Sequence, residues 1–166
     1  MDASRMTANP TIIDVEASGF GGDSYPIEVG VALGSGRRYC SLIRPEEDWV
    51  HWDDSAEDVH HISRDLLFEH GRPGEHVCEQ LRDLLHGLTV YSDGWVVDFP
   101  WLRKLFATHH REMSFRVSPL DGILSAEQME NWHATKDKVL KESSERRHRA
   151  SFDAWVIRET YKRTRA

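Results

Sequence analysis

Two acidic residues near the N-terminus have a spacing that would suit a metal site. Asp14 and Glu16 are two positions apart in a short β-branched segment, so in a strand both side chains point to the same face. Like charges placed side by side are unfavourable unless a cation lies between them. Carboxylate oxygens are ligands that Mg²⁺ and Mn²⁺ prefer. The alternative is that Glu16 lies beyond the strand, in a solvated turn.

Asp98 is a third acidic residue of interest, because it follows an expected strand and opens an expected helix over residues 98–108. Its spacing to Leu102 and Leu105 puts it on the inward face, at the N-terminal end of that helix. The local sequence nevertheless favours a structural role for Asp98. Aspartate is a preferred helix N-cap, and Pro100 stands where the first turn would be.

His148 and Asp153 form the third feature. Asp153 lies on an expected final helix over residues 150–163, and His148 comes five residues earlier, before the helix or in its first turn. This interval can present an imidazole above a metal ion that Asp153 holds. His148 is singled out by this spacing alone, because the chain contains ten histidines, and a lone histidine is more often a surface or core residue.

The elements expected around these residues are three strands, followed by helices that alternate with strands. Strands are expected at 11–15, 27–33, 38–43, 88–91 and 115–117, the first three as an antiparallel meander. Helices are expected in pieces over 55–69, from Pro73 along an apolar stripe to Leu85, and over 98–108, 126–141 and 150–163. This order predicts a mixed α/β domain over residues 11–166, after a loose lead-in over 1–10.

The composition excludes a broadly basic nucleic-acid binder. The 166 residues suit one domain with its own core, and the formal net charge is −7. A protein that holds nucleic acid by bulk positive charge would be basic. A nuclease is not excluded, because bound cations and a few local arginines can gather an anionic substrate.

The sequence carries no recognisable targeting segment. Residues 1–10 lack the apolar stretch of a signal peptide, and no apolar run approaches the roughly 20 residues needed to cross a bilayer. Cys40 and Cys78 are far apart and match no zinc pattern, so we interpret them as reduced thiols. We therefore expect a cytoplasmic protein that does not contact a membrane.

Taken together, these motifs resemble those of the DnaQ-like 3′–5′ exonucleases of the DEDDh type. Residues 11–20 (TIIDVEASGF) resemble the first motif of that family, 91–98 (YSDGWVVD) the second, and 148–153 (HRASFD) the third. Residues 25–30 resemble the family's second strand, and 58–63 resemble the segment beside the substrate. The order and separation of the motifs agree with the family from Thr11 to Tyr161.

The resemblance implies a ribonuclease H-like fold, with a mixed five-stranded sheet and helices on both faces. It implies a single exonuclease domain that releases nucleoside 5′-monophosphates from the 3′ end of single-stranded RNA or DNA. Asp14, Glu16, Asp98 and Asp153 would hold two divalent ions, Mg²⁺ or Mn²⁺. His148 would be the general base, a role suited to an imidazole whose ordinary pKa is about 6.5.

Four further residues are candidates for substrate contact, each with a structural alternative. Phe20 would wedge against the terminal base or only anchor its turn, and His60 would contact sugar or phosphate or only cap a helix. Trp95 would stack on a base or belong to the core. Arg149 would bind a backbone phosphate or lie in a solvated loop. The second motif departs from the family at two positions. Asp93 takes the place of the family's usual asparagine but lies one residue further from Asp98, and Val97 replaces an aromatic residue.

Other functions are also compatible with the sequence. The chain could be a binding module that kept the fold and lost catalysis, although all five motif residues are present. It could be a proofreading subunit that docks to a polymerase, although no docking tail indicates that partner. It could also be a phosphodiesterase acting on short oligonucleotides or small nucleotides. A homodimer is compatible with the sequence, which identifies no dimer surface.

Overall fold

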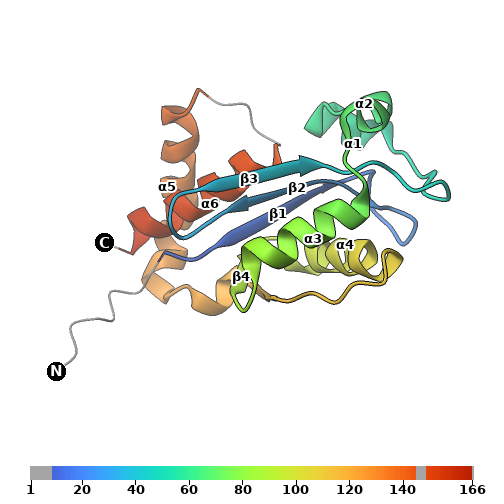
Figure 1. The fold of residues 1–166 in the computed structure, drawn as a ribbon. Helices are drawn as coiled ribbons and strands as arrows, with labels where there is room; N and C mark the ends of the chain where they lie inside the picture. The colour runs from blue at the N-terminus through green and yellow to red at the C-terminus, as the bar shows by residue number, and fades with distance from the viewer. Residues whose placement is uncertain (1–8, 145–148, 166) are drawn as a thin grey trace.

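The computed structural model describes residues 9–144 and 149–165, and its strands form one five-stranded mixed sheet (Figure 1). The strand order is β3-β2-β1-β4-β5. The strands are β1 (Ile12–Ala17), β2 (Pro26–Ala32), β3 (Arg38–Leu42), β4 (Thr89–Ser92) and β5 (Arg116–Pro119). The first three pair antiparallel, and β4 runs parallel to both β1 and β5. The predicted meander and the two later strands are therefore confirmed.

Helices cover both faces of the sheet, as predicted (Figure 1). The α-helices are α1 (Asp54–His60), α2 (Arg64–His70), α3 (Gly74–Leu85), α4 (Trp95–Thr108), α5 (Ala126–Glu142) and α6 (Ala150–Thr164). A short 3-10 helix, η1 (Leu120–Ile123), was not predicted. Helix α6 packs across β1, β2 and β3, and α5 packs against α6. Helix α4 contacts the sheet on its other face and carries α3 beside it.

The alternation of side chains along β1 assigns its residues to the two faces. Ile13 and Val15 belong to the main core, together with Leu102 and Leu105 of α4. Ile12 instead packs with Ala154 and other residues on the α6 side. Because successive side chains of a strand point to opposite faces, Asp14 and Glu16 lie on the face that α6 covers. That face is therefore the one on which a residue of α6 can reach them.

Gly30 of β2 allows the first turn of α6 to lie directly on the sheet. It is the cross-strand partner of Asp14 in the β1–β2 ladder. A Cβ at this position would lie 2.1 Å from the carbonyl carbon of Ala150 and from the amide nitrogen of Ser151. Only a residue without a side chain permits this approach of backbone to backbone. The helix that carries Asp153 thus begins beside Asp14.

One helix boundary differs from the prediction and changes the interpretation of Asp98. Helix α4 begins at Trp95, three residues before the predicted start, and its N-cap is Gly94. Asp98 is therefore not the N-cap, and the local interpretation as a cap was wrong. The predicted break between two short helices is confirmed, because Ser63 caps α2 and its hydroxyl accepts a hydrogen bond from the Leu66 N–H.

Within residues 9–144 and 149–165, no helix is long and apolar enough to cross a bilayer. Cys40 is exposed and Cys78 is buried, and both are free thiols.

Candidate active site

Asp14, Glu16 and Asp153 meet where β1 passes beneath the first turn of α6. One carboxylate oxygen from each residue lies within 4.8 Å of one from each of the others. The strand supplies the first two on one face, as their spacing predicted, and the docking of α6 on Gly30 supplies the third. Asp153 also lies in the first turn of α6, and the N-terminus of a helix favours negative charge. The structure thus brings together three of the four predicted metal ligands.

A second group of carboxylates shares Asp14 with the first. Asp14, Asp93 and Asp98 also place one oxygen each within 4.8 Å of the others. All four predicted ligands therefore belong to two adjoining groups, joined at Asp14. Asp93 is an addition that sequence reasoning noted only as a departure from a family pattern. The feature of the sequence that could have identified Asp93 is its position between the end of β4 and the start of α4.

The electrostatics of these carboxylates fit a cation. Burial, followed by the charges of Asp98, Glu16 and Asp153, raises the pKa of Asp14 well above its ordinary value. Burial and then the Asp153 charge raise the pKa of Glu16 to about 9. The Oδ2 atom of Asp14 is buried and has no hydrogen-bond partner among the described residues. A buried, unpaired carboxylate oxygen among like charges is costly, and a divalent ion would remove both penalties.

Ser92, the last residue of β4, orients Asp98. Its hydroxyl donates a hydrogen bond of 2.6 Å to Asp98 Oδ2 and accepts one of 3.1 Å from the Gly94 N–H. Burial raises the pKa of Asp98 to about 7, against the opposing effect of the Ser92 hydrogen bond. Sequence reasoning missed Ser92. A serine that ends a strand just before an acidic residue was its only signal.

A cavity of about 540 Å³ opens beside these carboxylates, and two of the predicted substrate residues line it. Its walls include Asp14 and Glu16 as well as Phe20, His60 and Trp101. The volume lies in the range of about 300–1,000 Å³ that is typical of small-molecule sites. The cavity therefore has room for a ligand the size of a nucleoside, next to the acidic residues.

Phe20 and His60 enter this cavity in different ways. The Phe20 side chain is 73% exposed, and its ring centroid lies 6.1 Å from that of Trp101. His60 is buried, and its Nδ1 accepts a 3.1 Å hydrogen bond from the Ile62 N–H, which places the ring proton on Nε2. Burial lowers the pKa of His60, partly offset by the Ala17 carbonyl. His60 is thus a neutral hydrogen-bond donor near neutral pH.

The remaining predicted substrate residues make contacts within the protein. Trp95 stacks on Phe99 with a centroid separation of 5.1 Å, and its indole N–H donates to the Val117 carbonyl at 3.1 Å. Trp95 is half-buried and lines a separate cavity beside Asp93. Arg149 forms an ion pair with Glu28, with Nη2 2.7 Å from Oε2.

His148, the predicted general base, lies outside the described residues. Arg149, the next residue along the chain, is described, and α6 begins one position later at Ala150. The general-base role of His148 therefore stays a prediction that rests on the resemblance.

The fold defined by this sheet and its helices is that of known exonucleases. No protein-family model and no curated protein matches the sequence. Among solved structures, the chain is similar to E. coli exonuclease I in a zinc-bound complex with single-stranded DNA, with a TM-score of 0.70 and 11% identity over 93% of this chain. It is also similar to the complex of that enzyme with a dT13 oligonucleotide, with a TM-score of 0.70 and 11% identity over 95% of this chain.

A third similar structure is a moderately thermophilic exonuclease I from Methylocaldum szegediense, with a TM-score of 0.57 and 13% identity. That match covers 77% of this chain and 30% of that one. The chain spans 40% of E. coli exonuclease I in the zinc-bound complex and 41% in the dT13 complex. These likenesses show that the chain has the ribonuclease H-like fold.

Proposed function

We propose that this chain is a divalent-metal-dependent 3′–5′ exonuclease of the DnaQ-like DEDDh type, acting on single-stranded nucleic acid. The observation that carries the proposal is the sharing of Asp14 between two adjoining groups of three carboxylates. Asp14 also has a buried oxygen without a partner among the described residues. The ribonuclease H-like fold and the three sequence motifs support the same activity.

In the proposed mechanism, Asp14, Glu16, Asp98 and Asp153 hold two ions, Mg²⁺ or Mn²⁺. When bound, such a pair supplies an activated water and stabilises the leaving oxygen of a phosphodiester. The Ser92 hydroxyl keeps Asp98 in position, and α6 holds Asp153 above β1. His148 takes the proton from the attacking water, so the product is a nucleoside 5′-monophosphate.

The cavity beside the carboxylates is the proposed seat of the 3′-terminal nucleoside. The exposed ring of Phe20 lies against Trp101 and offers a face on which an unpaired base can stack. His60 lines the same cavity, and its buried Nε2 has no hydrogen-bond partner among the described residues, so its N–H is the proposed donor to a sugar or phosphate oxygen. Similar structures were solved with single-stranded DNA, so single-stranded DNA is the first substrate to test and RNA the second.

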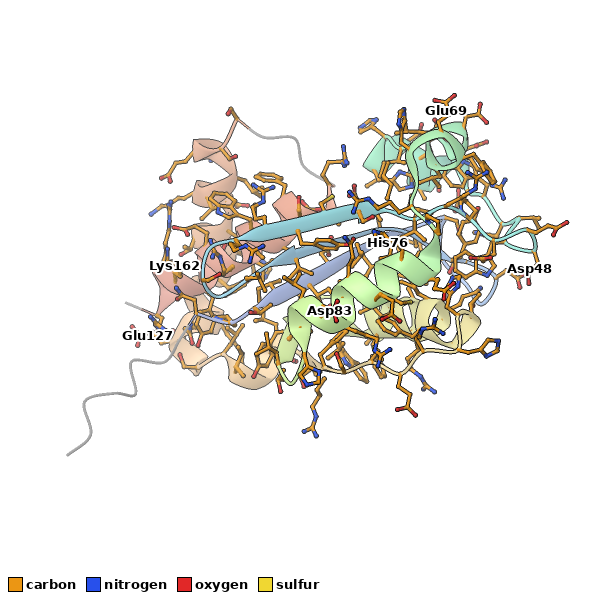
Figure 2. All side chains as sticks on the ribbon, viewed as in Figure 1. Asp48, Glu69, His76, Asp83, Glu127 and Lys162 are labelled. Atoms are coloured by element: carbon orange, nitrogen blue, oxygen red, sulfur yellow. The ribbon has the colours of Figure 1, made fainter. Side chains whose placement is uncertain are left out.

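The test is a cleavage assay with 5′-labelled single-stranded DNA and RNA, with Mg²⁺, Mn²⁺ or a chelator. The wild type is compared with Asp14→Asn and with Asp83→Asn, which changes an exposed aspartate on α3 outside both carboxylate groups (Figure 2). We expect metal-dependent shortening from the 3′ end that Asp14→Asn abolishes and Asp83→Asn keeps. Intact substrates in every wild-type reaction would overturn the proposal.

The same assay separates the proposal from the alternative of a phosphodiesterase for short oligonucleotides. Dinucleotides are compared with single strands of increasing length at equal concentration. An exonuclease is expected to shorten the longer strands stepwise. Cleavage confined to dinucleotides would instead favour the small-substrate activity.

A further inference from the structure

Asp93 is a fifth carboxylate at this site, and nothing in the proposed mechanism uses it. It lies in the turn between β4 and α4, with one oxygen within 4.8 Å of oxygens from both Asp14 and Asp98. Its negative charge contributes to the raised pKa values of both neighbours. An exposed aspartate could turn towards water, so its place beside two other carboxylates needs a cause.

Two contacts explain how Asp93 is held. The turn itself is fixed by the Ser92 hydroxyl, which binds the Gly94 N–H on one side and Asp98 on the other. From the opposite wall, Lys136 of α5 places its Nζ 4.0 Å from Asp93 Oδ2. Lys136 and Asp93 line one small cavity of about 100 Å³ together with Asp14 and Asp153. The lysine therefore faces the acidic residues, beside the carboxylate that it pairs with.

The distribution of hydrogen bonds indicates what Asp93 adds. Asp98 Oδ2 already accepts a short hydrogen bond from Ser92. That oxygen is therefore less available as a ligand for a cation. Asp14 Oδ2 has no donor among the described residues. An ion next to Asp14 and Asp98 would gain a further oxygen ligand from Asp93, and hard dications take six or more oxygens.

The net charge of the site also favours Asp93 as a metal ligand. The site holds five carboxylates, from Asp14, Glu16, Asp93, Asp98 and Asp153. Two divalent ions and the ammonium group of Lys136 would neutralise five negative charges. Without Asp93, two dications and the lysine would leave an excess positive charge in the cavity.

We propose that Asp93 is a fifth carboxylate ligand of the metal centre, held in place by Lys136 as a positioning residue. This inference rests on the proposed function, since it concerns the same two-ion site. It assigns α5, through its lysine, a part in metal binding. The competing interpretation is an ordinary surface ion pair, which contributes little to stability and would not affect metal binding.

The test measures Mn²⁺ binding to the full chain, by titration calorimetry and by the EPR signal of free Mn²⁺. The variants are Asp93→Asn, Lys136→Met and Lys136→Arg. Asp121→Asn is the matched control, because it removes an exposed aspartate of η1 outside both carboxylate groups. Circular dichroism in chelator verifies that every variant is folded.

We expect the wild type and Asp121→Asn to bind two Mn²⁺ ions alike. Asp93→Asn should weaken one of the two sites by at least about 10-fold, the lower end of what metal-orienting partners contribute. Lys136→Met should weaken the same site, and Lys136→Arg should restore it. Two unchanged sites in folded Asp93→Asn would overturn this inference and leave the proposed function standing. A wild type that binds no Mn²⁺ would overturn both.

Discussion

Arg149 and Glu28 connect the start of α6 to β2, an inner strand of the sheet. Arg149 Nη2 and Nε lie 2.7 and 3.0 Å from Glu28 Oε2, and the Ala150 N–H donates to Glu28 Oε1 at 2.7 Å. The Glu28 side chain is fully buried in β2, whereas that of Arg149 is 44% exposed. The pair therefore anchors the residue next to His148, and it fixes the helix that carries Asp153.

Removal of the arginine should destabilise the fold. Arg149→Met would leave the buried Glu28 carboxylate without its cation, a change that costs about 3–5 kcal/mol for fully buried pairs. Because Arg149 is partly exposed, we expect a smaller loss of unfolding free energy, about 1–3 kcal/mol. Urea denaturation measures it, with Arg37→Met in the β2–β3 turn as the exposed control. Equal stability of both variants would show that the pair is not an anchor.

Asp14→Asn should have opposite effects on activity and on stability. Partners that only orient metal ligands contribute about 10–100-fold, so loss of a shared ligand should lower kcat/KM by at least about 100-fold. In chelator, the same variant should unfold at a higher temperature, because asparagine replaces a carboxyl group whose ionisation is opposed by burial and by its acidic neighbours. Thermal unfolding measures the change in Tm, with Asp83→Asn as the control variant. A lower Tm for Asp14→Asn would contradict the prediction.

The stability of the metal-free protein should fall as the pH rises. The folded protein holds protons on Glu16, with a pKa of about 9, and on Asp98, with a pKa of about 7. The unfolded chain loses the same protons near pH 4. Between about pH 4 and 9 the folded state therefore binds more protons, so unfolding free energy declines with increasing pH. Denaturation in chelator across this range should show the decline.

Two comparisons test whether these carboxylates cause the decline of unfolding free energy with pH. Glu16→Gln should make the decline shallower, because glutamine does not titrate. Mn²⁺ should also flatten it, since the bound ion takes the place of the protons. A pH profile that neither the substitution nor the metal changes would exclude these groups as its origin.

Phe20→Ala should impair substrate binding without loss of stability. The Phe20 ring is mostly exposed, so its removal should change unfolding free energy by less than about 0.5 kcal/mol. Base stacking on an aromatic side chain contributes about 1–3 kcal/mol, and we expect that loss mainly as a higher KM for single-stranded DNA. Val96→Ala, at an exposed apolar residue of α4 that does not line this cavity, is the control. Unchanged KM in Phe20→Ala would remove the stacking role.

Gly30→Ala should be destabilising although it adds one carbon atom. Its Cβ would meet the Ala150 backbone, which cannot move without lifting α6 from the sheet. Overpacking of this kind costs about 1–3 kcal/mol, and we also expect weaker Mn²⁺ binding because Asp153 is displaced. Gly122→Ala is the control, since a Cβ there meets nothing within 4 Å. Identical Mn²⁺ affinities of Gly30→Ala and the wild type would show that the close packing of α6 on Gly30 does not position Asp153.

The parts of the site that the sequence predicted are those set by local periodicity. Asp14 and Glu16 share a face because a strand has a period of two, whatever its neighbours. Asp153 was placed correctly on its helix by the apolar positions that follow it. Asp98 was misinterpreted locally, because the helix begins at Trp95 and Gly94, rather than Asp98, takes the N-cap position.

Two of the contacts that sequence reasoning missed join distant segments of the chain. Glu28 and Arg149 are 121 positions apart, and their contact depends on α6 packing across β2. The pairing of Asp93 with Lys136 likewise requires α5 to face the β4–α4 turn. Neither follows from spacing, since each depends on strand order and on the choice of sheet face by a helix.

The proposed metal site joins β1 to α6, so its carboxylates come from distant parts of the chain. A chain synthesised only as far as α5 would contain Asp14, Glu16 and Asp98 but neither Asp153 nor the helix that docks on Gly30. Such long-range contacts form late, because the entropy of closing a long loop must be overcome first. On the proposed function, incomplete or partly folded chains should therefore be unable to cleave nucleic acid, because the carboxylates of the site come together only when α6 has docked on the sheet.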